Sequence, residues 1–172
     1  KLLEAFGKDL ILIETVGVGQ TELDIVEATD TTVVLLVPES GDTIQTMKAG
    51  IMEIADLFVI NKADRDGADR MLRELRMLVH MHPRHEWWET PVLATQAHKN
   101  VGIAELYTTI EQHRQSLTTT GQLLVRRRQR RQKELLALLQ QRLMAMLGAR
   151  LEQHEVLHTL NEQVQEGQID PY

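Results

Sequence analysis

The sequence has 172 residues, of which 42% are hydrophobic and 3% aromatic, enough for one core of Leu, Ile, Val and Met. The formal net charge of −6 argues against a protein that mainly binds nucleic acid or an anionic membrane. The absence of cysteine excludes disulfides, zinc–thiolate sites and thiol catalysis, and no apolar run approaches the roughly 20 residues of a transmembrane helix. We therefore expect neither nucleic acid nor a membrane among its partners.

The two ends of the sequence suggest that it is part of a longer protein. It begins at Lys1, without methionine, in a segment that leads directly to an apolar run. It stops at Asp170-Pro171-Tyr172, which has the composition of a turn. We expect further chain on both sides.

Four short apolar runs have the continuous pattern of parallel strands that are buried on both faces. They cover residues 10–13, 32–37, 57–60 and 91–94. Segments with helical spacing of apolar residues lie between or after them, at 43–54, 67–79 and 101–113. Strands that alternate with helices predict an α/β fold with a doubly wound, mostly parallel sheet.

After Leu117 the strand pattern ends, and a joint is expected at residues 118–121. Residues 122–147 predict one helix of roughly 40 Å, and residues 152–166 predict a second helix. Two helices cannot bury their own apolar stripes, so they should pack on the α/β part or against a second copy. We predict an α/β domain over residues 1–117 and a helical arm over 118–172.

Asn61-Lys62-Ala63-Asp64 directly follows the predicted strand at residues 57–60. It could be an ordinary strand-to-helix turn, in which Asn and Asp are common. It also matches the N-K-x-D loop of GTPases. A carboxylate at Asp64 can accept hydrogen bonds from both N1–H and the exocyclic amine of guanine, a donor pair that adenine lacks. The Lys62 stem can lie over the base, and Asn61 can tie the loop to nearby backbone. Since ligands of parallel sheets bind at the carboxyl ends of strands, we favour guanine binding.

Glu14 ends the first apolar run, and Gly17 follows three residues later. The acid could cap a helix or form an ion pair. We favour an acid that holds a water of bound Mg²⁺, with Gly17 allowing a backbone N–H to approach a terminal phosphate. Ala97, after the last predicted strand, is expected to offer its backbone N–H to guanine O6. Gln20 is a candidate for positioning the attacking water, by its proximity alone.

Three segments, "ETVGVGQTE", "SGDTIQTMKAGIMEIADLFVINKAD" and "GQIDPY", together resemble the MeaB/ArgK-type GTPases. Those are P-loop proteins that serve adenosylcobalamin-dependent acyl-CoA mutases, with methylmalonyl-CoA mutase as the principal client. The resemblance extends over essentially the whole sequence. It implies a GTP-hydrolysing chaperone with GTP or GDP and Mg²⁺ as cofactors, in the cytoplasm or, in a eukaryote, the mitochondrial matrix.

The resemblance also implies roles for particular residues. Glu14 and Gly17 match the Walker B and second switch motif, and the base-recognition loop matches residues 61–64. Residues 40–50 match a mobile loop that communicates the nucleotide state to the mutase. The residues of this loop that the resemblance implies are involved are Asp42, Gln45 and Lys48. The C-terminal helices match an arm that forms a homodimer, incomplete at its end in this sequence.

The sequence departs from the family pattern at two places. The phosphate-binding loop G-x-x-x-x-G-K-[ST] and the first switch do not occur in it, and Gln96 stands where many related G proteins have Ser. We therefore expect this chain by itself to bind GTP weakly and to be inactive as a GTPase.

Two other segments have several interpretations. The basic residues at 126–133 surround a helix at 100° per residue, which favours a solvated segment over contact with an acidic partner, an anion or nucleic acid. The histidines at 80–86 do not share a helix face, and Pro83 interrupts the helix. We expect a structural loop there, leading to Trp87 and Trp88, rather than a metal site.

Two alternative functions remain open at this stage. One is a related P-loop GTPase with another client, in transport or in the maturation of a metal centre. The other is a non-catalytic dimerising module whose α/β part is degenerate.

Overall fold

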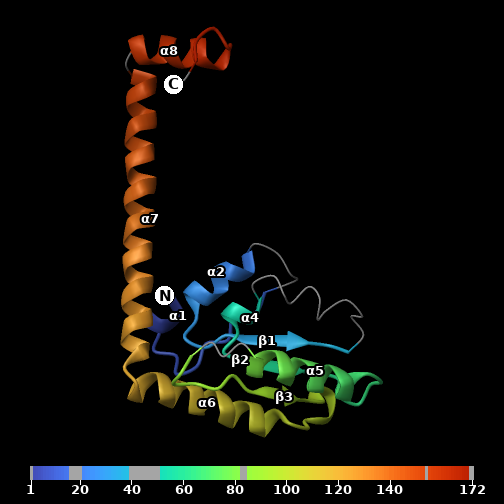
Figure 1. The fold of residues 1–172 in the computed structure, drawn as a ribbon. Helices are drawn as coiled ribbons and strands as arrows, with labels where there is room; N and C mark the ends of the chain where they lie inside the picture. The colour runs from blue at the N-terminus through green and yellow to red at the C-terminus, as the bar shows by residue number, and fades with distance from the viewer. Residues whose placement is uncertain (1, 16–20, 39–50, 82–84, 154, 171–172) are drawn as a thin grey trace. The chain divides into compact units, whose positions relative to one another are not determined.

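The computed structural model describes residues 2–15, 21–38, 51–81, 85–153 and 155–170 (Figure 1). The chain forms two compact units, Lys1–Arg127 and Arg128–Tyr172. The first contains the sheet, and the second is helical.

The first unit contains a parallel sheet of three strands, in the order β1-β2-β3. The strands are β1 (Val33–Leu36), β2 (Leu57–Ile60) and β3 (Val92–Ala94). Leu36 pairs with Ile60, and Ile60 with Ala94, so the carboxyl ends of the strands are aligned. All four residues of β2 are fully buried, as a continuous apolar run in a central strand requires. The α/β class with a parallel sheet is confirmed.

The predicted strand at residues 10–13 is wrong in this structure. The segment is irregular, and Leu10, Leu12 and Ile13 are 56%, 84% and 49% exposed. Among the described residues, no strand pairs with the outer edge of β1. An apolar run forms a strand only when a neighbour takes its backbone hydrogen bonds, and here this run has no such neighbour in the sheet.

Helix α5 (Ala68–Met81) covers one face of the sheet. Its buried side chains recur about every four positions, as the apolar spacing predicts. They are Ala68, Met71, Leu75 and Val79. The last three pack with side chains of β1, β2 and β3 in one core cluster.

The remaining helices of the first unit are mostly short. They are α1 (Leu2–Ala5), α2 (Thr21–Ala28), α4 (Ile51–Ile54), the 3-10 turn η1 (Ala97–Lys99) and α6 (Ile103–Thr119). Helices α1 and α2 were not predicted from the apolar spacing. Helix α6 is longer than predicted, and its buried residues include His113 and Leu117, both 0% exposed.

Helix α7 (Gln122–Gln153) begins in the first unit and continues into the second, where α8 (Glu155–Gln165) follows it. The break before α7 falls at Gly121, whose φ of 73° favours glycine. The predicted apolar stripe of α7 is exposed: Leu139 and Leu143 are 50% and 57% exposed. Within the described residues, no helix is long and apolar enough to cross a membrane.

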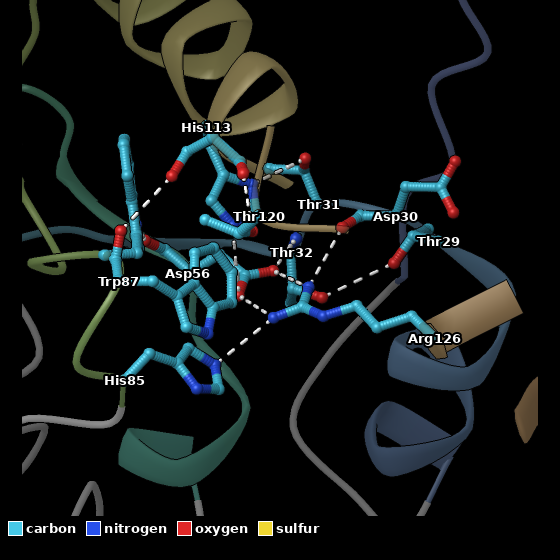
Figure 2. A network of polar contacts seen from close by, with 12 residues as sticks. Thr29, Asp30, Thr31, Thr32, Asp56, His85, Trp87, His113, Thr120 and Arg126 are labelled. Carbon is cyan, nitrogen blue, oxygen red and sulfur yellow. Dashed lines mark hydrogen bonds and ion pairs between the residues drawn. The ribbon is translucent and has the colours of Figure 1, made fainter. Parts of the chain in front are cut away.

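A buried ion pair holds the first turns of α7 against the amino ends of the strands (Figure 2). Asp56 directly precedes β2, and its side chain is 2% exposed. Arg126 donates one hydrogen bond to each carboxylate oxygen of Asp56, at 3.1 and 3.2 Å. The backbone N–H of Thr32 donates to the same carboxylate at 2.9 Å, and His113 Nε2 lies 3.5 Å from it.

Aromatic rings surround this ion pair. His85 stacks on Trp87 with ring centroids 4.7 Å apart, and the rings of Trp87 and Trp88 lie 5.9 and 4.8 Å from that of His113. The Arg126 guanidinium lies 5.5 Å from the centre of the Trp87 ring. The segment that contains His85 thus contributes to packing. In the described part of the chain, no group of three or more His, Asp or Glu side chains could hold a metal ion.

The solvated interpretation of the basic run is wrong for Arg126, which is paired with the buried Asp56. Arg127 is exposed and forms an ion pair with Asp30 at the surface. The prediction failed because a charge pattern around a helix does not reveal a carboxylate that lies 70 positions earlier in the sequence. Arg128 and Arg131 are exposed.

Candidate functional site

The candidate site lies where β2 and β3 end side by side. Residues 61–64 follow β2 directly, and residues 95–102 follow β3. Because these two strands are paired in parallel, with Ile60 opposite Ala94, their following loops start next to each other. The structure therefore brings together two segments that are about 35 positions apart.

Asn61 joins the two loops. Its side-chain oxygen accepts hydrogen bonds from Thr95 Oγ1 at 3.2 Å and from the backbone N–H of Ala97 at 3.1 Å. The backbone N–H of Ala63 donates to the carbonyl oxygen of Thr95 at 3.0 Å. Between them Lys62 has a φ of 56°, a left-handed conformation that few residues other than glycine adopt. Hydrogen bonds to the loop after β3 thus hold the N-K-x-D segment in place, unlike an ordinary turn. We call residues 61–64 the braced loop.

The Ala97 backbone N–H, expected at guanine O6, donates to Asn61 Oδ1 in this structure. Asn61 and Ala97 are therefore neighbours, as base recognition by both requires. A guanine that used the Ala97 N–H would share or replace this bond.

The carboxylate of Asp64 faces two basic side chains from the loop after β3. Lys99 Nζ donates to Asp64 Oδ2 at 3.2 Å, and His98 Nε2 lies 3.6 Å from the same oxygen. The Asp64 side chain is 32% exposed, so it is accessible to a ligand. The pKa of Asp64 lies below its ordinary value. The main cause is a hydrogen bond from its own backbone N–H, followed by the bond from Lys99.

A glycine closes the loop after β3. Gln96 and Val101 exchange backbone hydrogen bonds of 3.0 and 3.2 Å across it. Gly102 follows with a φ of 77°, and a Cβ at this position would lie 2.4 Å from the carbonyl oxygen of Ala94. Only glycine allows this approach, so Gly102 determines how the loop lies beside residues 61–64.

Several predicted site residues cannot be located relative to this site. Gly17, Gln20, Asp42, Gln45 and Lys48 lie outside the described residues. Glu14 is described and is exposed, in the irregular segment that follows residues 10–13.

The predicted role of Glu14 implies a bound magnesium ion. A single carboxylate can hold Mg²⁺ through water, because this ion retains several of its waters. However, the described residues contain no group of three acidic or histidine ligands to complete such a site. Among the described residues, Glu14 alone does not constitute a magnesium site.

Two residues of this region, Lys99 and Gly102, were not among the predicted site residues. Neither belongs to the N-K-x-D motif. A glycine in the first turn of the helix predicted at residues 101–113, shortly after a predicted strand, was the available signal for Gly102. Nothing in the sequence pointed to Lys99, because its partner Asp64 lies 35 positions earlier.

A parallel α/β sheet with an N-K-x-D loop at the carboxyl end of its central strand has the form of the nucleotide-binding region of P-loop GTPases. The chain belongs to the MeaB family. The family model described as methylmalonyl Co-A mutase-associated GTPase MeaB matches residues 1–152. The predicted resemblance is therefore confirmed.

Curated relatives agree with this assignment. A putative GTPase of Pyrococcus abyssi is 42% identical over 175 residues, covering 100% of this chain and 54% of the relative. The mouse protein named methylmalonic aciduria type A homolog, mitochondrial, is 33% identical over 174 residues, covering 99% and 42%. The GTPase ArgK of Escherichia coli is 36% identical over 126 residues, covering 71% and 38%. The chain thus spans about half the length of the curated relatives it matches, or less.

Proposed function

We propose that this chain is part of a GTP-binding and GTP-hydrolysing chaperone that supports an adenosylcobalamin-dependent acyl-CoA mutase, such as methylmalonyl-CoA mutase. The braced loop at residues 61–64, at the end of the fully buried strand β2, supports the guanine-binding part of this proposal. Membership of a family described as mutase-associated supports the chaperone part.

In this proposal the residues of the loop have separate tasks. Asp64 accepts the N1–H and the exocyclic amine of guanine, and the Lys62 stem lies over the base. Asn61 holds the loop after β3 in place, as its bonds to Thr95 and Ala97 suggest. Ala97 contributes its backbone N–H near O6.

The remaining predicted residues have tasks that concern the phosphates and the client. Glu14 would contribute one water-mediated contact to Mg²⁺, whose other ligands are not among the described residues. The ion would neutralise phosphate charge, and Gly17 would lie near the terminal phosphate. Gln20 positions the attacking water. The loop with Asp42, Gln45 and Lys48 transmits the nucleotide state to the mutase.

We also propose that residues 118–172 form an arm through which two copies of the protein associate. The support is the exposed apolar surface of α7 in the second unit. It consists of Leu135, Leu136, Leu138, Leu139, Leu143, Met144, Met146 and Leu147. Apolar residues that lie along more than three helical turns and are each half exposed or more are typical of an association surface.

Substitution of Asp64 by Asn tests the base assignment in the full-length protein. Xanthine has a carbonyl oxygen where guanine has the exocyclic amine, and the Asn side chain can donate to it. We expect D64N to lose affinity for GDP and to gain affinity for XDP, measured by competition with a fluorescent nucleotide. The matched control is D66N, which removes a charge from the same loop. If D64N retains the guanine preference of the wild type, the base assignment is incorrect.

The client is tested separately. Purified full-length protein should bind methylmalonyl-CoA mutase, with an affinity that differs between GDP and a non-hydrolysable GTP analogue. Equal binding with both nucleotides contradicts the chaperone proposal but leaves the guanine site intact. Absence of binding favours a GTPase with another client.

A further inference from the structure

Two basic side chains contact one oxygen of the Asp64 carboxylate, the group proposed to bind the guanine base. Lys99 Nζ lies 3.2 Å and His98 Nε2 3.6 Å from Asp64 Oδ2. Neither residue belongs to the N-K-x-D motif. Asp64 is partly exposed, and these contacts, together with the hydrogen bond from its own backbone N–H, restrict the orientation of its side chain.

The backbone that carries Lys99 is itself fixed. Lys99 ends the 3-10 turn η1, and its N–H donates to the carbonyl oxygen of Gln96 at 2.9 Å. The next residue, Asn100, has a left-handed φ of 58°, and its N–H donates to the carbonyl oxygen of Ala97 at 3.1 Å. The bridge between Gln96 and Val101 closes the loop around this turn. The ammonium group therefore extends from a defined point beside Asp64.

We infer that Lys99 is a positioning residue for base recognition, which holds the Asp64 carboxylate in the orientation that accepts both donors of guanine. The inference deepens the proposed function and rests on it. His98 contributes to the same effect as a weaker, longer contact.

The chemistry of the two groups favours positioning over blocking. Each carboxylate oxygen can accept two hydrogen bonds, so Oδ2 can bind Lys99 and a donor of the base together. The ammonium has donors only, so it cannot satisfy the N1–H or the amine of guanine in place of the carboxylate. Lys99 thus supplies a side-chain contact to the aspartate from the neighbouring loop.

The lowered pKa of Asp64 agrees with this role, because Lys99 is its second cause after the residue's own backbone N–H. A lowered pKa keeps the carboxylate ionised as the pH falls through the ordinary range of aspartate. Guanine affinity that needs the ionised form is then lost only at lower pH. Without Lys99, that loss should begin at higher pH.

The test compares GDP with IDP, whose base lacks the exocyclic amine, in the full-length protein. The pair is exposed, so we expect K99M to lower GDP affinity about two- to fivefold. The ratio of GDP to IDP affinity should also fall, because recognition of the amine depends on the orientation of the carboxylate. K99R, which keeps the cation, should restore most of both. K8M is a matched control in which an exposed lysine outside the two loops is removed, and it should change neither value.

Other outcomes would contradict the inference about Lys99 or the proposed function itself. If K99M lowers GDP and IDP affinity by the same factor, Lys99 only stabilises the loop, and the inference is wrong. If K99M raises GDP affinity, Lys99 blocks the site instead of preparing it. If D64N alters base preference while K99M changes nothing, the proposed function survives and the inference fails. If D64N leaves the base preference unaltered, both the proposed guanine site and the inference about Lys99 are wrong.

Discussion

The buried pair of Asp56 and Arg126 allows a direct test of what stabilises the first unit. Replacement of Arg126 by Ala removes both guanidinium hydrogen bonds from the Asp56 carboxylate, which is 2% exposed and keeps the hydrogen bond from the Thr32 N–H and the contact with His113. Removing one partner of a buried ion pair typically costs about 3–5 kcal/mol. Because the Arg126 side chain is 21% exposed, water can reach part of the vacated space, so we expect the lower end, about 3 kcal/mol.

Arg127 provides a matched control on the same turn of α7. Its ion pair with Asp30 is more exposed, with side chains 48% and 28% accessible. Exposed pairs contribute roughly 0–1 kcal/mol, so R127A should destabilise much less than R126A. Both variants remove one arginine from the helix, and the comparison therefore isolates burial of the partner.

Urea denaturation followed by tryptophan fluorescence measures both variants, since Trp87 and Trp88 lie beside the pair. The midpoint should fall far more for R126A than for R127A at a similar m-value. A double-mutant cycle with D56N should show that the two substitutions together cost less than their sum. If R126A and R127A destabilise equally, the buried carboxylate does not depend on Arg126 and the reasoning is refuted.

Four further results are expected. G102A should destabilise the fold by about 1 kcal/mol or more in urea denaturation, and more than G121A. Both glycines have positive φ, but only at Gly102 does a Cβ meet a backbone oxygen. N61A should weaken GDP binding roughly tenfold by calorimetry, since it removes both side-chain bonds that join the loops. Glu substitutions at Leu139 and Leu143 should convert a dimer to monomers in light scattering, and an unchanged dimer would place the association surface elsewhere. The isolated 172-residue chain should bind GTP with a Kd weaker than about 1 μM and should not hydrolyse it, because it contains no phosphate-binding loop.

The sequence by itself determined the features that depend on local pattern. A continuous apolar run indicated that β2 is buried on both faces, and the four-residue spacing of α5 indicated its core side. The N-K-x-D motif could be placed at a sheet edge because it follows such a run without a gap. These features depend on residues that are close together in the chain, so the sequence alone reveals them.

Only the tertiary structure decided which polar side chains meet. Arg126 and Asp56 are 70 positions apart, and Lys99 and Asp64 are 35 apart. No periodicity reports such pairs, because they arise from strand order and loop closure. The run at residues 10–13 shows the same limit for apolar residues. Its composition suits a strand, but a strand also needs a neighbour that accepts and donates its backbone hydrogen bonds. Only the tertiary structure decides whether such a neighbour is present.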